Sequence, residues 1–116
     1  MHPTILMSDI FQASDVASGK LAALTPPARL SVFGDPVAHS KSPVFHNAAL
    51  RAAGLDAQYV KIHVRPDELH ATLRALPAAG FLGTNVTIPH KAGALAAVDE
   101  ADDYARKSGA VNTVVV

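Results

Sequence analysis

Residues 30–43 read LSVFGDPVAHSKSP, and this stretch begins a repeating strand–loop–helix pattern. The apolar run at residues 30–33 predicts a short strand that ends at Gly34. Ser42 and Pro43 are typical of the N-cap and first position of a helix. Helical spacing then places four apolar side chains on one face, which we expect to be buried: Phe45, Ala48, Ala49 and Ala52.

The same alternation continues to Val116. Strands are predicted over residues 58–64, 81–87 and 110–116, and helices are predicted to begin at Pro66, Pro89 and Glu100. Crossovers of this length indicate a mainly parallel sheet with right-handed connections. The sequence therefore predicts an α/β fold with three αβα layers over residues 29–116. Residues 1–28, where Pro26 and Pro27 would stop any helix, are expected to be a weakly structured lead-in.

The composition describes one small domain, with 116 residues, 49% hydrophobic and 17% charged. Ten basic and ten acidic residues give no net charge, which argues against a nucleic-acid partner. No apolar stretch is long enough for a membrane helix, so no membrane partner is predicted. The chain has no cysteine, which excludes disulfides and thiolate catalysis and fits a cytoplasmic location.

The first polar cluster follows the first strand and contains Ser40 and Ser42, two residues apart at a helix N-terminus. Hydroxyls, free backbone N–H groups and the helix dipole together suit a carboxylate or a phosphate. The alternative is that Ser42 only caps the helix and that Ser40 is only solvated.

The second polar cluster lies in GTNVTIPHK, residues 83–91. Asn85 and Thr87 alternate with apolar residues and so share one side of the strand end. Lys91 lies in the first turn of the next helix, where the dipole disfavours a cation and eases deprotonation of the ammonium. That position suits a lysine acting as acid and base, and an ordinary surface lysine is the alternative.

The third cluster is SGAVNT, residues 108–113, in which Asn112 is a polar residue in an apolar strand. Its amide needs either a structural hydrogen bond or a ligand, and the sequence does not decide between them. The six histidines show no H-E-x-x-H or H-x-H spacing, so no metal site is predicted, and His90 is expected to be solvated. Tyr59 is expected either in the core or lining the cleft. All three clusters are expected at the carboxyl edge of the sheet, where ligands of such folds bind.

Taken in order, these clusters resemble the shikimate dehydrogenase family. The pattern G-x-P-x-x-H-S-x-S-P-x-x-H-N corresponds to residues 34–47, N-V-T-x-P-x-K to residues 85–91, and G-A-V-N-T to residues 109–113. The resemblance covers about residues 29–116, which correspond to the family's substrate-binding domain.

The resemblance implies NADP-dependent, reversible reduction of 3-dehydroshikimate to shikimate in aromatic amino-acid biosynthesis. Ser40 and Ser42 would hold the substrate carboxylate. The amides of Asn85 and Asn112 and the hydroxyl of Thr87 would bind ring hydroxyls. Lys91 would donate a proton to the forming alkoxide and act as the base in the reverse direction. A homodimer is a further assembly that the family could imply.

The sequence also departs from the family pattern. The family pairs its lysine with an aspartate in an N-T-D-G segment after G-A-V-N-T, and Val116 precedes that point. No G-x-G-x-x-G is present, so the NADP site is expected on a C-terminal Rossmann domain that this chain lacks. We therefore expect little or no turnover from the chain alone. The alternatives are a quinate/shikimate dehydrogenase, a non-catalytic module that binds polyhydroxy carboxylates, and a structural domain.

Overall fold

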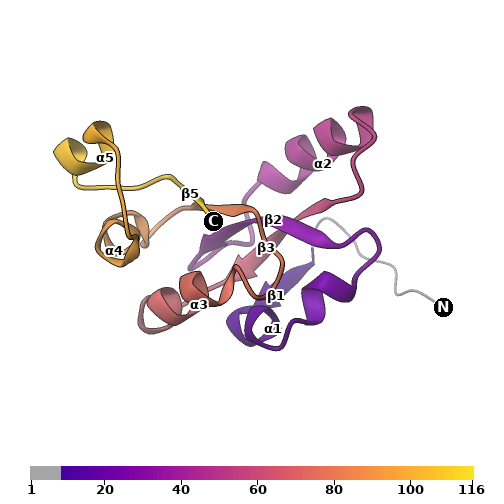
Figure 1. Ribbon diagram of the computed structural model, residues 1–116, viewed down its shortest axis with the longest axis horizontal. Coiled ribbons are helices and arrows are strands. Elements are labelled where there is room, and N and C mark those ends of the chain that lie inside the picture. Colours follow the sequence, from indigo (N-terminus) through magenta and orange to yellow (C-terminus); the bar gives the residue numbers. More distant parts are fainter. Residues whose placement is uncertain (1–8) are drawn as a thin grey trace.

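The computed structural model describes residues 9–116, except for the side chain of Tyr104. One five-stranded sheet with the order β1-β3-β2-β4-β5 forms its centre (Figure 1). The strands are β1 (Ile10–Gln12), β2 (Ala28–Gly34), β3 (Gln58–His63), β4 (Gly83–Val86) and β5 (Thr113–Val115). The first four strands run parallel, and β5 pairs antiparallel with β4. The predicted mainly parallel α/β sheet is therefore confirmed.

Helices cover both faces of the sheet (Figure 1). They are α1 (Ala13–Ala17), η1 (Lys20–Ala23), α2 (Ser42–Ala52), η2 (Pro66–Glu68), α3 (Leu69–Ala75), α4 (Lys91–Ala97) and α5 (Asp103–Ser108). α1, α3 and α4 pack on one face, and α2 packs on the other. None of the helices in residues 9–116 has the length and apolar character needed to cross a bilayer.

The two faces of the sheet differ in chemistry because side chains alternate along each strand. We call the side covered by α1, α3 and α4 the core face. It carries the main apolar cluster, including Phe33, Ile62 and Val86. We call the side covered by α2 the polar face. It carries Tyr59, Lys61 and Asn85 together with a much smaller apolar cluster.

The lead-in predicted over residues 1–28 is structured wherever it is described. Strand β1 pairs with β3, so the segment adds an edge strand to the sheet. Val16 and Leu21 are fully buried in the main core. The expectation of weak structure was therefore wrong for residues 9–28, because two apolar side chains from short helices complete that core. Residues 1–8 lie outside the described residues.

Helix α2 presents the opposite face from the one predicted. Phe45 is 70% exposed, and the three alanines that share its face are exposed as well. Pro43 and Asn47 face the sheet instead. The Asn47 amide donates to the Tyr59 carbonyl at 2.9 Å and accepts from the Tyr59 N–H at 2.8 Å. These two hydrogen bonds fix the rotation of the helix about its axis. A hydropathy pattern does not predict that rotation, because the buried residue is polar.

Candidate functional site

The structure brings the three polar clusters to the carboxyl edge of the parallel strands, where ligands of such sheets bind. The Asp35 N–H donates to the Ile88 carbonyl at 3.0 Å and joins the first loop to the second. The Val111 N–H donates to the Lys91 carbonyl at 2.9 Å and joins the third cluster to the start of α4. The predicted convergence is therefore present in the backbone.

The first cluster differs from the alternative in which Ser42 caps the helix and Ser40 is only solvated. Helix α2 begins at Ser42, and Lys41 holds the N-cap position without a side-chain cap. The Ser40 hydroxyl accepts from the Ser42 N–H at 3.3 Å, so Ser40 orders the helix start. Both serines are only half-buried, which leaves them accessible to a ligand.

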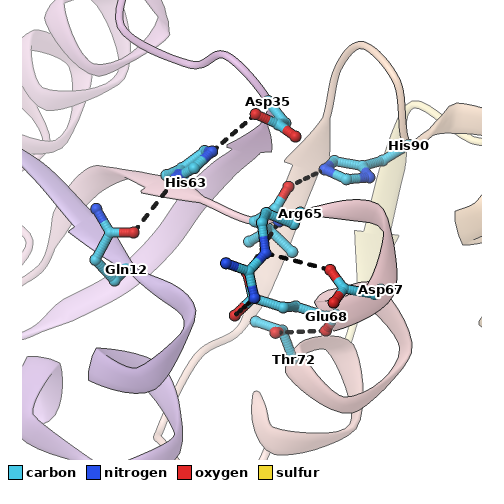
Figure 2. A network of polar contacts seen from close by, with 9 residues as sticks. Gln12, Asp35, His63, Arg65, Asp67, Glu68, Thr72 and His90 are labelled. Atoms are coloured by element: carbon cyan, nitrogen blue, oxygen red, sulfur yellow. Dashed lines mark hydrogen bonds and ion pairs between the residues drawn. The ribbon is translucent and has the colours of Figure 1, made fainter.

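Two ionisable side chains from β3 hold the serine loop in place. The buried Lys61 ammonium donates to the Ala38 carbonyl at 2.8 Å. The next side chain on the same side of β3, His63, lies between Asp35 at 2.8 Å and Gln12 at 3.3 Å (Figure 2). The loop that carries Ser40 is thus attached to β3 at its start and at its middle, which lowers the entropy cost of ordering it around a ligand.

The second cluster places two predicted residues at the end of β4. The Asn85 Nδ2 donates to the Thr113 hydroxyl at 3.0 Å, while its Oδ1 accepts from the Tyr59 hydroxyl at 2.7 Å. Thr87 lies against the end of β2, where a Cβ on Gly34 would come within 2.7 Å of the Thr87 Cγ2. Glycine at position 34 therefore permits the close approach of the two loops.

Helix α4 begins at Lys91 rather than at Pro89 as predicted, and the preceding turn is buried. His90 is 1% exposed, and its Nε2 contacts the Val64 carbonyl (Figure 2). The sequence had favoured a solvated histidine, which was wrong. Lys91 is exposed and makes no ion pair with any residue in the described part of the chain.

Asn112 lies beside the second cluster through its backbone. Its carbonyl accepts from the Val86 N–H at 2.9 Å, just ahead of β5. Its side chain is exposed and forms no hydrogen bond with residues 9–116. The structural alternative for this amide is thus not observed among those residues, and the amide is available to a ligand.

Tyr59 is a site residue that the sequence left undecided between core and cleft. Its side chain is 3% exposed, and its ring stacks on His46 with centroids 4.4 Å apart. Burial raises the pKa of Tyr59 to about 12, and a hydrogen bond with the Ser42 side chain acts in the opposite direction. The phenol therefore touches the first and second clusters at once. Tyr59, Lys61 and His63 alternate along β3 and so share one side of the strand. This alternation was the signal in the sequence that could have placed Tyr59 in the site.

Neither a metal site nor a dinucleotide site is formed by the described residues. No group of three or more histidine and acidic side chains in residues 9–116 could hold a metal ion. A dinucleotide pyrophosphate needs a glycine-rich turn between a strand and a helix. Across the three connections that leave β2, β3 and β4 at this edge, the sole glycine is Gly34 at the end of β2. These residues do not fit a nicotinamide nucleotide.

Comparison with known proteins agrees with this geometry. Residues 32–114 match the family model described as the shikimate dehydrogenase substrate binding domain. The chain is 53% identical over 87 residues to a shikimate dehydrogenase (NADP(+)) of Rubrobacter xylanophilus, covering 75% of this chain and 31% of the relative. The corresponding enzyme of Paramagnetospirillum magneticum is 49% identical over 90 residues, covering 77% and 33%.

Solved structures lead to the same family. A shikimate 5-dehydrogenase from Thermus thermophilus, in complex with NADP(H) and shikimate, superposes with a TM-score of 0.72 at 41% identity. The match covers 76% of this chain and 33% of that one. This chain thus spans about a third of the length of the relatives it matches. It belongs to the shikimate dehydrogenase family, and residues 32–114 correspond to that family's substrate binding domain.

Proposed function

We propose that the chain binds shikimate and 3-dehydroshikimate as the substrate-binding and catalytic unit of an NADP-dependent shikimate dehydrogenase. Hydroxyls, amides and an unpaired ammonium meet at one edge of the sheet within the segment that matches the family, and this observation carries the proposal. The names of the relatives supply the substrate and the nucleotide.

In this proposal the hydroxyls of Ser40 and Ser42 receive the substrate carboxylate beside the first turn of α2. The dipole of α2 favours a negative charge at this end of the helix. The accessible serines and the absence of a side-chain cap from Ser42 support this assignment.

The amides of Asn85 and Asn112 and the hydroxyl of Thr87 are proposed to bind the ring hydroxyls. Lys91 is proposed to give a proton to the carbonyl oxygen of 3-dehydroshikimate as it becomes an alkoxide, and to remove it in the reverse direction. The exposed, unpaired ammonium at the start of α4 supports this role. The hydride for the same carbonyl carbon would come from NADPH when that nucleotide is bound.

We propose that the nucleotide binds to residues outside 9–116, in the C-terminal Rossmann domain expected from the family. The poor fit of the strand-to-helix connections supports this division, as does a match that covers only about a third of the relatives' length. The chain alone is then expected to bind substrate with little or no turnover. The cytoplasmic location and the homodimer stay predictions, and light scattering tests the latter.

The test is an NMR titration of the chain with shikimate. Shifts at Ser40, Asn85 and Lys91 are expected to saturate together at millimolar ligand or below. The absence of shifts at these residues would contradict the proposed function. A parallel titration with quinate, which has an additional hydroxyl beside its carboxylate, separates a shikimate site from a quinate/shikimate site. Turnover is then measured in a longer chain that includes a nucleotide-binding domain. Saturable shikimate binding without turnover in that chain would favour the alternative of a non-catalytic module that binds polyhydroxy carboxylates.

A further inference from the structure

The side-chain amide of Asn85 is held at both of its ends. An amide has one accepting oxygen and one donating nitrogen, so the partner of each end decides which way the group faces. The Tyr59 hydroxyl donates to Oδ1 at 2.7 Å, and Nδ2 donates to the Thr113 hydroxyl at 3.0 Å. The oxygen therefore points to the buried phenol, and the N–H groups point toward the exposed side of β5.

The Tyr59 hydroxyl is itself fixed in position. The ring is buried and stacked on His46 at an interplanar angle of 6°. Both backbone groups of Tyr59 are bound by the Asn47 amide. With its pKa at about 12, the phenol keeps its proton, and so remains a donor, at any physiological pH.

We infer that Tyr59 is a positioning residue whose hydroxyl orients Asn85, so that Asn85 offers an N–H donor to an oxygen of the ligand. The inference rests on the proposed function for the identity of that ligand. Thr113 occupies one of the two Nδ2 hydrogens, which leaves one for the ligand. Without the phenol, the amide can turn over, and the hydrogen bond from Nδ2 to the ligand oxygen is then lost.

The first experiment compares Tyr59→Phe with the unaltered chain by NMR titration with shikimate. The variant keeps the stacked ring and loses only the hydroxyl. A three- to tenfold rise in Kd is expected, the size typical of one net hydrogen bond. Tyr104→Phe, at the chain's other tyrosine, is the matched control and should leave Kd unchanged. Equal Kd values for Tyr59→Phe and the unaltered chain would overturn the inference.

The second experiment asks whether the phenol acts through Asn85. In an Asn85→Ala background, the added Tyr59→Phe change is expected to alter Kd by less than about twofold, because the group that it orients is gone. A loss as large as that in the unaltered background would show that Tyr59 acts independently, and would overturn the inference.

A third measurement needs no ligand. The two Nδ2 proton resonances of Asn85 are expected to move in free Tyr59→Phe and to stay in place in free Tyr104→Phe. If the unaltered chain does not bind shikimate, the proposed function fails while this signature still decides the orientation. Unmoved Asn85 resonances in Tyr59→Phe would overturn the inference even where shikimate binds.

Discussion

The two faces of the sheet are built for different purposes from the same strands. On the core face, Phe33, Ile62 and Val86 are buried in one continuous apolar cluster under three helices. On the polar face, one helix covers a small cluster, and Tyr59 on β3 and Asn85 on β4 hydrogen-bond each other across the intervening strand β2. Residues adjacent in sequence, such as Asn85 and Val86, therefore lie on the polar face and in the apolar core, respectively.

This separation teaches how a small domain can hold a polar site without losing its fold. Apolar burial stabilises in proportion to the area removed from water, and the core face provides most of it. The polar face is then free to carry groups that would weaken a core. If the separation is real, changes on one face should alter unfolding and changes on the other should alter binding.

The largest effect is expected from Phe33→Ala on the core face. Phe33 is fully buried, so its loss should lower the free energy of unfolding by about 3–5 kcal/mol. The matched change Phe45→Ala, on the exposed side of α2, should alter it by less than about 0.5 kcal/mol. Urea denaturation measures both variants. Similar losses in the two would contradict the assignment of the core.

Lys91→Met tests the candidate site, where we expect a loss of activity without a loss of stability. We expect at least about a 100-fold loss of turnover in a chimera that joins this chain to the rest of the Rubrobacter relative. The thermal midpoint should stay within a degree or two, because the ammonium is exposed and unpaired. Lys107→Met, in the last turn of α5, is the control. Substantial activity in Lys91→Met would remove the proposed acid/base role.

A pair of serine changes separates the two faces at the scale of a single hydroxyl. Ser31 is buried on the core face and donates to the Thr84 hydroxyl at 2.7 Å, so Ser31→Ala should cost about 1 kcal/mol of stability. Ser42→Ala should leave stability nearly unchanged and weaken shikimate binding about tenfold, as for a hydrogen bond to a charged group. Calorimetry measures both quantities. A loss of stability in Ser42→Ala together with a loss of binding in Ser31→Ala would contradict the separation of the two faces.

The smallest effect at neutral pH is expected from the ionisation of Tyr59. In Tyr104→Phe, which leaves one tyrosine, the ultraviolet absorbance should titrate near pH 12 rather than near 10. Because the folded pKa is raised, the contribution to stability is complete below about pH 10 and is lost as the pH rises toward 12. A midpoint near pH 10 in the folded chain would show that the phenol is not buried on the polar face.

The sequence was sufficient for the strands β2, β3 and β4 and for the loops that follow them, because apolar runs and turn residues mark them locally. It failed for β1, whose three residues have no repeating pattern and become a strand only through pairing with β3. The burial of His90 was missed for a related reason. Its partner is the Val64 carbonyl, and such a long-range contact leaves no local signal.

The polar residues of the candidate site were predictable as a group, because they lie at or beside strand ends on one edge of the sheet. Their connections were not. Which serine orders α2, and how Tyr59 and Asn85 meet, depends on strand order and on the rotation of α2. That rotation was predicted wrongly because Asn47, a polar residue, is on the buried side. Patterns of hydropathy do not record a side chain that is buried in order to bind a backbone.

The amide of Asn47 has a consequence for how the sheet ends. Among residues 9–116, strand β1 begins its pairing at Lys61, so the peptide groups of Tyr59 on that side face no strand formed by those residues. Asn47 supplies one donor and one acceptor there, the same pair that a strand would offer. The side chain thus satisfies two backbone groups that an added extended segment would otherwise pair with.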